Sequence, residues 1–231
     1  MTYKSENTPT ETHWEGLYKD GIGSPKYPNG HVARWLFRHF PRQSAGEFQM
    51  LDMGCGAGRH TLMMAREGYQ VRASDHSENA LAQARNWARE EALNIDLRQA
   101  SAESQPFKDA SFDGILSYAV LYYLPRLKME MAFDEIYRLL KNGGKAFIMV
   151  KNHRDIRAEK GDEVAPHEYL ITQTDEGMPW NNEQNMQLTL LPRAEIQNIC
   201  RKFSHIMIDE MTCSHENGLY REAAWLIYLV K

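Results

Sequence analysis

The chain has 231 residues, of which 42% are hydrophobic and 25% are charged, and its formal net charge is −4. This length and composition suit one compact α/β domain whose core needs no disulfide or metal for stability. A mildly acidic chain lacks the electrostatic footprint of a nucleic-acid or anionic-membrane binder, so we expect neither partner.

The residue types that form disulfides and metal sites show no functional spacing. Three cysteines, Cys55, Cys200 and Cys213, contain no CxxC pair, which argues against a disulfide framework and structural zinc. Nine histidines show no HxH or HExxH spacing, so we predict no metal site. Residues 1–20 lack a signal-peptide core, and the apolar run 223–230 is too short to span a bilayer. We therefore expect a cytoplasmic protein.

The first 44 residues are predicted to form an N-terminal lid or helical segment. Residues 1–24 are polar and loosely held, apart from the aromatic stretch 14–18. Apolar residues then recur at helical spacing over 32–40, and Pro41 ends that helix. The main domain is predicted to occupy 45–231.

Strands and helices alternate through the middle of the chain. The predicted strands are 48–53, 70–74, 95–99, 112–117 and 145–151. Helical apolar stripes lie between them at 61–67, after the N-cap residue Ser77, and over 133–140. This alternation is typical of βαβ units and predicts a parallel, doubly wound sheet.

The pattern changes after residue 151. Two alternating segments at 168–174 and 185–191 predict a β-hairpin inserted at about 165–191. A helix at 193–203 and two terminal strands, 205–211 and 223–230, follow it. We therefore predict an α/β fold, with a Rossmann-like, doubly wound, mostly parallel sheet. An antiparallel terminal strand pair closes this sheet, and the hairpin is inserted before the last helix.

One motif carries most of the functional information. The segment 51–58 reads LDMGCGAG and lies where the first strand turns into a helix. Glycines let a backbone approach a ligand closely, and the following helix points its free N–H groups at that ligand. The second strand ends at Asp75, where an acid accepts both hydroxyls of a ribose. The spacing GxGxG, with Arg59 in place of a third glycine, differs from the GxGxxG fingerprint of nicotinamide dinucleotides.

With these residues the chain resembles the class I S-adenosylmethionine-dependent methyltransferases. The segment 51–58 matches the family's first motif, and Asp75 matches its ribose-binding acid. Residues 112–117 match its fourth strand, and 140–144 match the turn before its fifth. The start of the first helix, with Gly58-Arg59-His60, is similar to that of small bacterial methyltransferases.

The resemblance implies a role for each matching residue. The backbone of Gly54, Cys55 and Gly56 would lie along the methionine and ribose parts of the cofactor. Asp52 would anchor the loop and reach the methionine amine through water, and Ser117 would offer its carbonyl to that amine. The remaining cofactor contacts are expected from Tyr18, Asp75, His76 and Ala102. The family often places an aspartate before the residue matching Ala102. Here Ser101 stands there, so Ser101 or Glu103 would substitute.

Three places can contribute to the acceptor site. Tyr122 and Tyr123 follow the fourth strand and either wall the pocket, hydrogen-bond the nucleophile, or pack under the helix. His153, after the fifth strand, is the best-placed general base by topology, with a solvated loop histidine as the alternative. Trp14 and Tyr18 belong to the N-terminal segment, which in relatives folds over the cofactor as a lid. The inserted hairpin can cap the acceptor or pair with another subunit.

These observations predict methyl transfer from S-adenosylmethionine to a small-molecule acceptor by in-line displacement. Residues 117–120 lack the motif of DNA amine methyltransferases, and the paired-glutamate loop of protein-arginine methyltransferases is missing. The alternatives are a non-catalytic adenosylmethionine-binding sensor or partner subunit, and a nicotinamide-dependent oxidoreductase. The oligomeric state stays open between monomer and homodimer.

Overall fold

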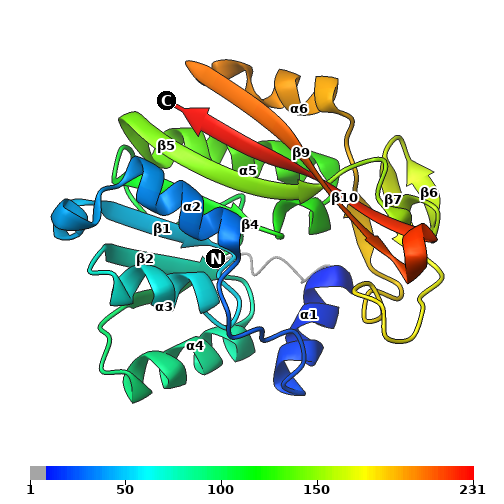
Figure 1. Ribbon diagram of the computed structural model, residues 1–231, viewed down its shortest axis with the longest axis horizontal. Coiled ribbons are helices and arrows are strands. Elements are labelled where there is room, and N and C mark those ends of the chain that lie inside the picture. Colours follow the sequence, from blue (N-terminus) through cyan, green and yellow to red (C-terminus); the bar gives the residue numbers. More distant parts are fainter. Residues whose placement is uncertain (1–8) are drawn as a thin grey trace, which may run out of the picture.

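The computed structural model describes residues 9–231, in which a seven-stranded sheet is flanked by helices on both faces (Figure 1). The strand order is β3-β2-β1-β4-β5-β10-β9. The first five strands are β1 (Gln49–Met53), β2 (Gln70–Asp75), β3 (Asp96–Gln99), β4 (Phe112–Tyr118) and β5 (Leu140–Lys151). They are parallel, whereas β10 (Tyr220–Val230) pairs antiparallel with both β5 and β9 (His205–His215). The predicted fold class is confirmed.

Alternation along the central strands builds a separate core on each face of the sheet. Ile115 and Ile148 pack with α5 (Arg126–Leu139) and α6 (Arg193–Ile199) on one face. Their neighbours Leu116 and Phe147 pack with α2 (Gly30–His39) and α3 (Arg59–Arg66) on the other. Successive side chains of a strand point to opposite faces, so a strand buried on both faces is apolar throughout. This explains the unbroken apolar run 146–150 in β5 and the adjacent apolar residues Ile115 and Leu116 in β4.

The helix α4 (Glu78–Glu90) begins where the sequence predicts it. The Ser77 hydroxyl accepts a hydrogen bond from the Ala80 N–H at 3.0 Å, which satisfies one of the free donors of the first turn. Its apolar side packs over Ala73 and Leu97 through Leu81. The helix thereby lies against β2 and β3, and its N-terminus lies beside the end of β2.

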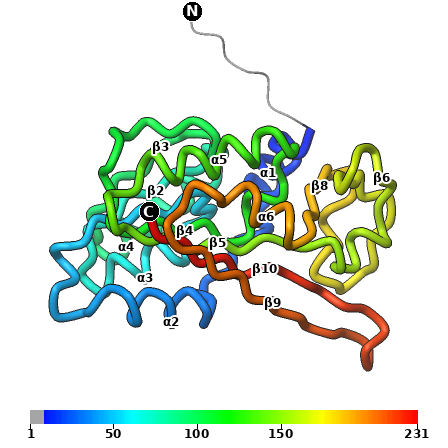
Figure 2. Tube along the Cα trace, turned by 90° about the horizontal axis from the view of Figure 1, so that it is seen from above, coloured from blue at the N-terminus to red at the C-terminus, as the bar shows by residue number. Residues whose placement is uncertain are grey.

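The inserted segment is a three-stranded antiparallel sheet rather than a hairpin alone. The predicted pair appears as β7 (Glu168–Ile171) and β8 (Gln187–Thr189), and β6 (Gly161–Ala165) adds a third strand. Residues 152–167 read as irregular because β6 is acidic and its one large apolar residue, Val164, is 55% exposed. Figure 2 shows this sheet at one end of the molecule, the end toward which the β9–β10 hairpin also extends.

Several predicted boundaries shift. The helix α5 begins at Arg126 rather than near 133, and it ends at Leu139, with β5 starting at Leu140 instead of after the Asn142-Gly143-Gly144 turn. Exposed Leu127 and Met131 obscure the apolar stripe of its first turns.

The N-terminal stretch that read as loosely held forms α1 (Pro9–Lys19) within the described residues, while residues 1–8 lie outside them. Within 9–231, no helix combines the length and apolarity needed to cross a membrane.

We expect the terminal strand pair to be central to stability. Ile227 of β10 is fully buried and lies between Ile148 of β5 and Ile208 of β9. Ile227→Ala should lower the free energy of unfolding by about 3 kcal/mol in urea titration, because a cavity replaces packed methyl groups. Leu219→Ala, at a site 71% exposed, is the control and should change it by less than about 0.5 kcal/mol. Equal effects of the two substitutions would contradict this description of the core.

Candidate cofactor and acceptor site

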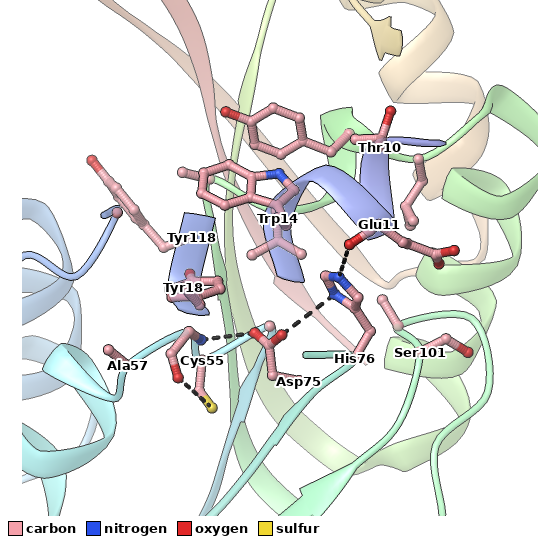
Figure 3. Close-up of a pocket in the computed structure, with 18 of the residues that line it drawn as sticks. Thr10, Glu11, Trp14, Tyr18, Cys55, Ala57, Asp75, His76, Ser101 and Tyr118 are labelled. Atoms are coloured by element: carbon pink, nitrogen blue, oxygen red, sulfur yellow. Dashed lines mark hydrogen bonds and ion pairs between the residues drawn. The ribbon is translucent and has the colours of Figure 1, made fainter. Parts of the chain in front are cut away.

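A cavity of about 240 Å³ lies at the carboxyl ends of β1, β2 and β4, beneath α1 (Figure 3). Ligands of open α/β sheets bind at this edge because loops and helix N-termini converge there. Most residues singled out in the sequence line it, namely Tyr18, Gly54, Cys55, Gly56, Asp75, His76, Ser101, Ala102, Tyr122 and Tyr123. Asp52, Glu103, Ser117 and His153 lie outside this lining. Across residues 9–231, no cluster of three or more His, Cys, Asp or Glu side chains is arranged to hold a metal.

The loop after β1 forms a cradle that only glycine can build. Gly54 has φ +76°, and a Cβ there would lie 2.5 Å from the Val120 side chain. Gly56 has φ +54°, and a Cβ there would lie 2.5 Å from the Tyr18 hydroxyl oxygen. The N–H groups of Gly54 and Cys55 both donate to the Ser74 carbonyl, at 2.8 and 2.9 Å. The loop is therefore fixed to the end of β2 and leaves its inner side open to a ligand.

The Asp75 carboxylate faces this cradle from the end of β2. Its Oδ2 accepts from the Gly56 N–H at 2.8 Å and its Oδ1 from the Ser77 N–H at 2.9 Å. Burial raises the pKa of Asp75, and the neighbouring His76, with Nδ1 at 3.4 Å, opposes that rise. Two backbone donors leave further carboxylate lone pairs at the cavity, which suits a ligand that presents paired hydroxyls.

Asp52 acts on the loop from behind rather than from the cavity. It is buried in β1, and its Oδ2 accepts a hydrogen bond from the Thr61 hydroxyl of α3 at 2.6 Å. This contact ties the strand to the helix across the glycine loop. Burial raises the pKa of Asp52 to about 6, although the Thr61 hydrogen bond lowers it.

The pKa of Asp52 predicts a pH-dependent stability. Between its ordinary pKa of 3.8 and about 6, the folded protein binds a proton that the unfolded chain has released. Asp52 therefore reduces the free energy of unfolding as pH rises through this window. In urea titrations Asp52→Asn should be more stable than wild type by about 2 kcal/mol at pH 7, and the difference should vanish near pH 4. A difference that does not change with pH would show that Asp52 is not the titrating group.

The side of the cavity beyond Asp75 is formed by His76 and residues 100–102. The His76 Nε2 lies 3.3 Å from the Glu11 carbonyl oxygen of α1. Ser101 and Ala102 line the cavity, whereas Glu103 forms an ion pair with Lys128 at 2.9 Å and lies outside it. Of the two residues considered as substitutes for the family's aspartate, Ser101 lines the cavity and Glu103 does not.

The helix α1 covers the cavity through polar contacts that the sequence did not reveal. The Glu15 carboxylate accepts hydrogen bonds from the Ser77 hydroxyl and from Asn79 Nδ2, the latter at 2.7 Å. Gln83 Nε2 donates to the Tyr18 carbonyl at 2.6 Å. Because Asn79 and Gln83 lie one turn apart on α4, they bind one face of α1. Polar spacing of this kind on a surface helix is too common to signal a docking site.

The residues predicted to form the acceptor site lie in different places in the structure. Tyr122 and Tyr123 line the cavity, and the Tyr123 ring meets the Trp14 ring edge-on with centroids 5.1 Å apart. His153 follows a turn after β5 and packs beside Trp225, with ring centroids 6.3 Å apart. Burial lowers the pKa of His153. His153 does not line the cavity, because the chain turns at Asn152, whose side chain accepts from the Arg154 N–H at 2.8 Å.

Ser117 and a buried charge cluster complete the surroundings of the site. The Ser117 side chain is fully buried within β4, and no hydrogen-bond partner for its hydroxyl occurs in the part of the chain that the structure describes. The charge cluster unites two cations and three carboxylates: Lys151, Asp155, Arg157, Glu183 and Glu222. These residues are scattered between 151 and 222, so no sequence motif could show that they meet.

Comparison with known proteins identifies the family. A family model described as a methyltransferase domain matches residues 51–148. The ubiquinone biosynthesis O-methyltransferase of Nitrosococcus oceani is 31% identical over 183 residues, which are 74% of this chain and 68% of that protein. The chain belongs to the class I S-adenosylmethionine-dependent methyltransferases. The narrower resemblance to enzymes with a Gly-Arg-His helix start stays a prediction.

Other similarities are shorter or lie in the fold alone. An uncharacterized protein of Mycobacterium tuberculosis is 33% identical over 97 residues, and the chain spans 35% of that protein's length. An N-methyltransferase of Haemonchus contortus, solved with phosphomonomethylethanolamine and S-adenosylhomocysteine, superposes with a TM-score of 0.65 at 20% identity. That superposition covers 95% of this chain and 56% of the other.

S-adenosylmethionine is the cofactor of this methyltransferase family, and the cavity fits it. The positive-φ glycines Gly54 and Gly56 leave space where side chains would stand, and the Asp75 carboxylate is placed to accept ribose hydroxyls. His76 and Ala102 border the space on the far side of Asp75, where an adenine ring would follow the ribose.

The contribution of Asp75 is testable by calorimetry. Asp75→Ala should weaken S-adenosylhomocysteine binding about a hundredfold, because two hydrogen bonds to a charged group are lost. Asp209→Ala, at an exposed position on β9, is the matched control and should leave the affinity unchanged. Retention of wild-type affinity in Asp75→Ala would exclude the ribose role.

Proposed function

We propose that this protein transfers the methyl group of S-adenosylmethionine to a small-molecule acceptor. The observation that carries the proposal is one cavity that joins the glycine cradle and Asp75 to a phenol-lined wall beneath α1. The bound cofactor supplies a methyl group on a positively charged sulfur, which is already activated for in-line displacement. The protein then has mainly to orient the two molecules and exclude water.

The residues around the cavity suit these tasks. Trp14 and Tyr18 of α1 lie over the cradle, with ring centroids 5.7 Å apart, and shield it from solvent (Figure 3). Burial raises the pKa of Tyr122, as does the nearby Glu183 carboxylate, so this phenol stays neutral at physiological pH. Tyr122 therefore acts as a neutral hydrogen-bonding wall rather than as a phenolate base.

The remaining parts of the proposal rest on composition and on relatives. The O-methyltransferase of Nitrosococcus oceani supports a small acceptor. The formal net charge of −4 supports the absence of nucleic-acid and membrane partners. The proposal includes a cytoplasmic address, in keeping with the free thiols of Cys55, Cys200 and Cys213, and a monomer or homodimer. The alternative is a non-catalytic adenosylmethionine-binding module, which a turnover assay must distinguish from an enzyme.

Thermal melting tests the cofactor part of this proposal. S-adenosylmethionine and S-adenosylhomocysteine should each stabilise the protein by about 2.7 kcal/mol at a hundred times their dissociation constants, and NAD should not. Incubation with labelled S-adenosylmethionine and a pool of small hydroxylated and amine metabolites should then produce S-adenosylhomocysteine. A shift with NAD alone would overturn the proposal. Binding without acceptor-dependent turnover would identify a non-catalytic module.

A further inference from the structure

A chain of hydrogen bonds runs from the cavity wall into the buried charge cluster. The Tyr122 hydroxyl donates to the Tyr123 hydroxyl at 3.0 Å, and the Tyr123 hydroxyl donates to Glu183 Oε1 at 2.9 Å. Arg157 donates two hydrogen bonds to Glu183, from Nε to Oε2 at 2.5 Å and from Nη2 to Oε1 at 2.9 Å. Arg157 and Glu183 are nearly fully buried, and both tyrosines line the cavity.

The direction of every bond in this chain follows from its buried end. An arginine guanidinium can only donate, and an ionised carboxylate can only accept. Glu183 is ionised because Arg157 pairs with it in bidentate geometry. Tyr123 has one proton and must give it to Glu183, so its oxygen accepts the single proton of Tyr122. Neither phenol has a donor left for the cavity, and only oxygen lone pairs remain.

The rest of the charge cluster holds Glu183 and Arg157 in this arrangement. Arg157 Nη1 also donates to Asp155 Oδ1 and to Glu222 Oε1, both at 2.9 Å. Lys151 Nζ lies 2.5 Å from Glu222 Oε1 and 3.2 Å from Asp155 Oδ2. The guanidinium therefore cannot turn away without breaking its bonds to Asp155 and Glu222 and leaving the buried Glu183 carboxylate without the ion pair that it forms with Arg157.

We propose that the Tyr122–Tyr123–Glu183 chain makes this wall an acceptor of hydrogen bonds only, and so selects methyl acceptors that present an O–H or N–H group. This inference rests on the proposed function and specifies the substrate class of the same cavity. A hydroxyl or amine proton is met by a phenol lone pair. The oxygen of an ether or ketone, or the sulfur of a thioether, meets lone pairs instead and gains no hydrogen bond, which disfavours such a group in a desolvated site.

Phenol and anisole are suitable probes, because they share a ring that fits the aromatic wall and differ in the O–H donor. Each is titrated by calorimetry into protein saturated with S-adenosylhomocysteine, so that the cofactor end of the cavity is filled. Wild type should bind phenol about fivefold more tightly than anisole, the value of one neutral hydrogen bond. The same ratio is expected for aniline against N,N-dimethylaniline.

Two variants should remove this preference by opposite routes. In Tyr122→Phe the lone pair is lost, so phenol should weaken to the affinity of anisole while anisole is unchanged. In Tyr123→Phe the Tyr122 proton loses its partner and turns to the cavity, so anisole should strengthen about fivefold toward phenol. Tyr69→Phe is the matched control, since the Tyr69 hydroxyl is bonded to the Phe40 carbonyl outside the cavity lining.

The outcomes separate this inference from the proposed function. S-adenosylhomocysteine should still bind and saturate all three variants, which shows that fold and cradle are intact. Equal affinities for phenol and anisole in wild type, binding of neither probe, or an unchanged preference in Tyr122→Phe would each overturn the inference. Failure of wild type to bind S-adenosylhomocysteine would instead overturn the proposed function.

Discussion

The site depends on the hydrogen bond between the Asp75 carboxylate and the Gly56 N–H. This bond joins the end of β2 to the loop after β1, at the edge of the sheet where these two neighbouring parallel strands both end. Glycine is required at position 56 because the backbone has positive φ and because a Cβ there would clash with the Tyr18 hydroxyl. The buried carboxylate is costly to desolvate, and backbone donors from Gly56 and Ser77 compensate only part of that cost. A ligand with hydroxyl donors completes the compensation, so the arrangement of Asp75 and the loop suits a nucleoside.

The cover over this site is held by polar contacts in addition to the apolar packing of Trp14 and Leu17. The carboxylate of Glu15 and the carbonyl of Tyr18 bind side chains of α4, and the Thr10 hydroxyl accepts from the Gln187 N–H of β8 at 3.0 Å. Individual hydrogen bonds of this kind contribute about 1 kcal/mol each. The polar part of this interface can be exchanged for water at modest cost, whereas the apolar part cannot.

The sequence was sufficient for the sheet and the cradle because both are encoded locally. Alternation and length identify strands. The run from Leu51 to Gly58 followed by Asp75 indicates a strand, a ligand-binding glycine loop and an acid at the end of the next parallel strand. The same reasoning could not place His153, whose position depends on a turn made by Asn152, nor find β6, which lacks an apolar stripe. It also missed Arg157 and Glu183 as partners, since long-range pairing between polar residues leaves no period or spacing in the chain.

The buried charge cluster is difficult to explain by stability alone. Removing five charged side chains from water is expensive, and well-packed apolar residues commonly stabilise a core as much or more. An apolar replacement would hold the inserted sheet against β10 equally well, but it would leave the Tyr122 and Tyr123 hydroxyls free to rotate. The pairing of Arg157 with Glu183 commits the proton of each phenol to a buried hydrogen bond, so that only oxygen lone pairs remain for the cavity. The desolvation cost of the cluster is therefore offset by a fixed hydrogen-bond direction at Tyr122 and Tyr123, which apolar packing cannot provide.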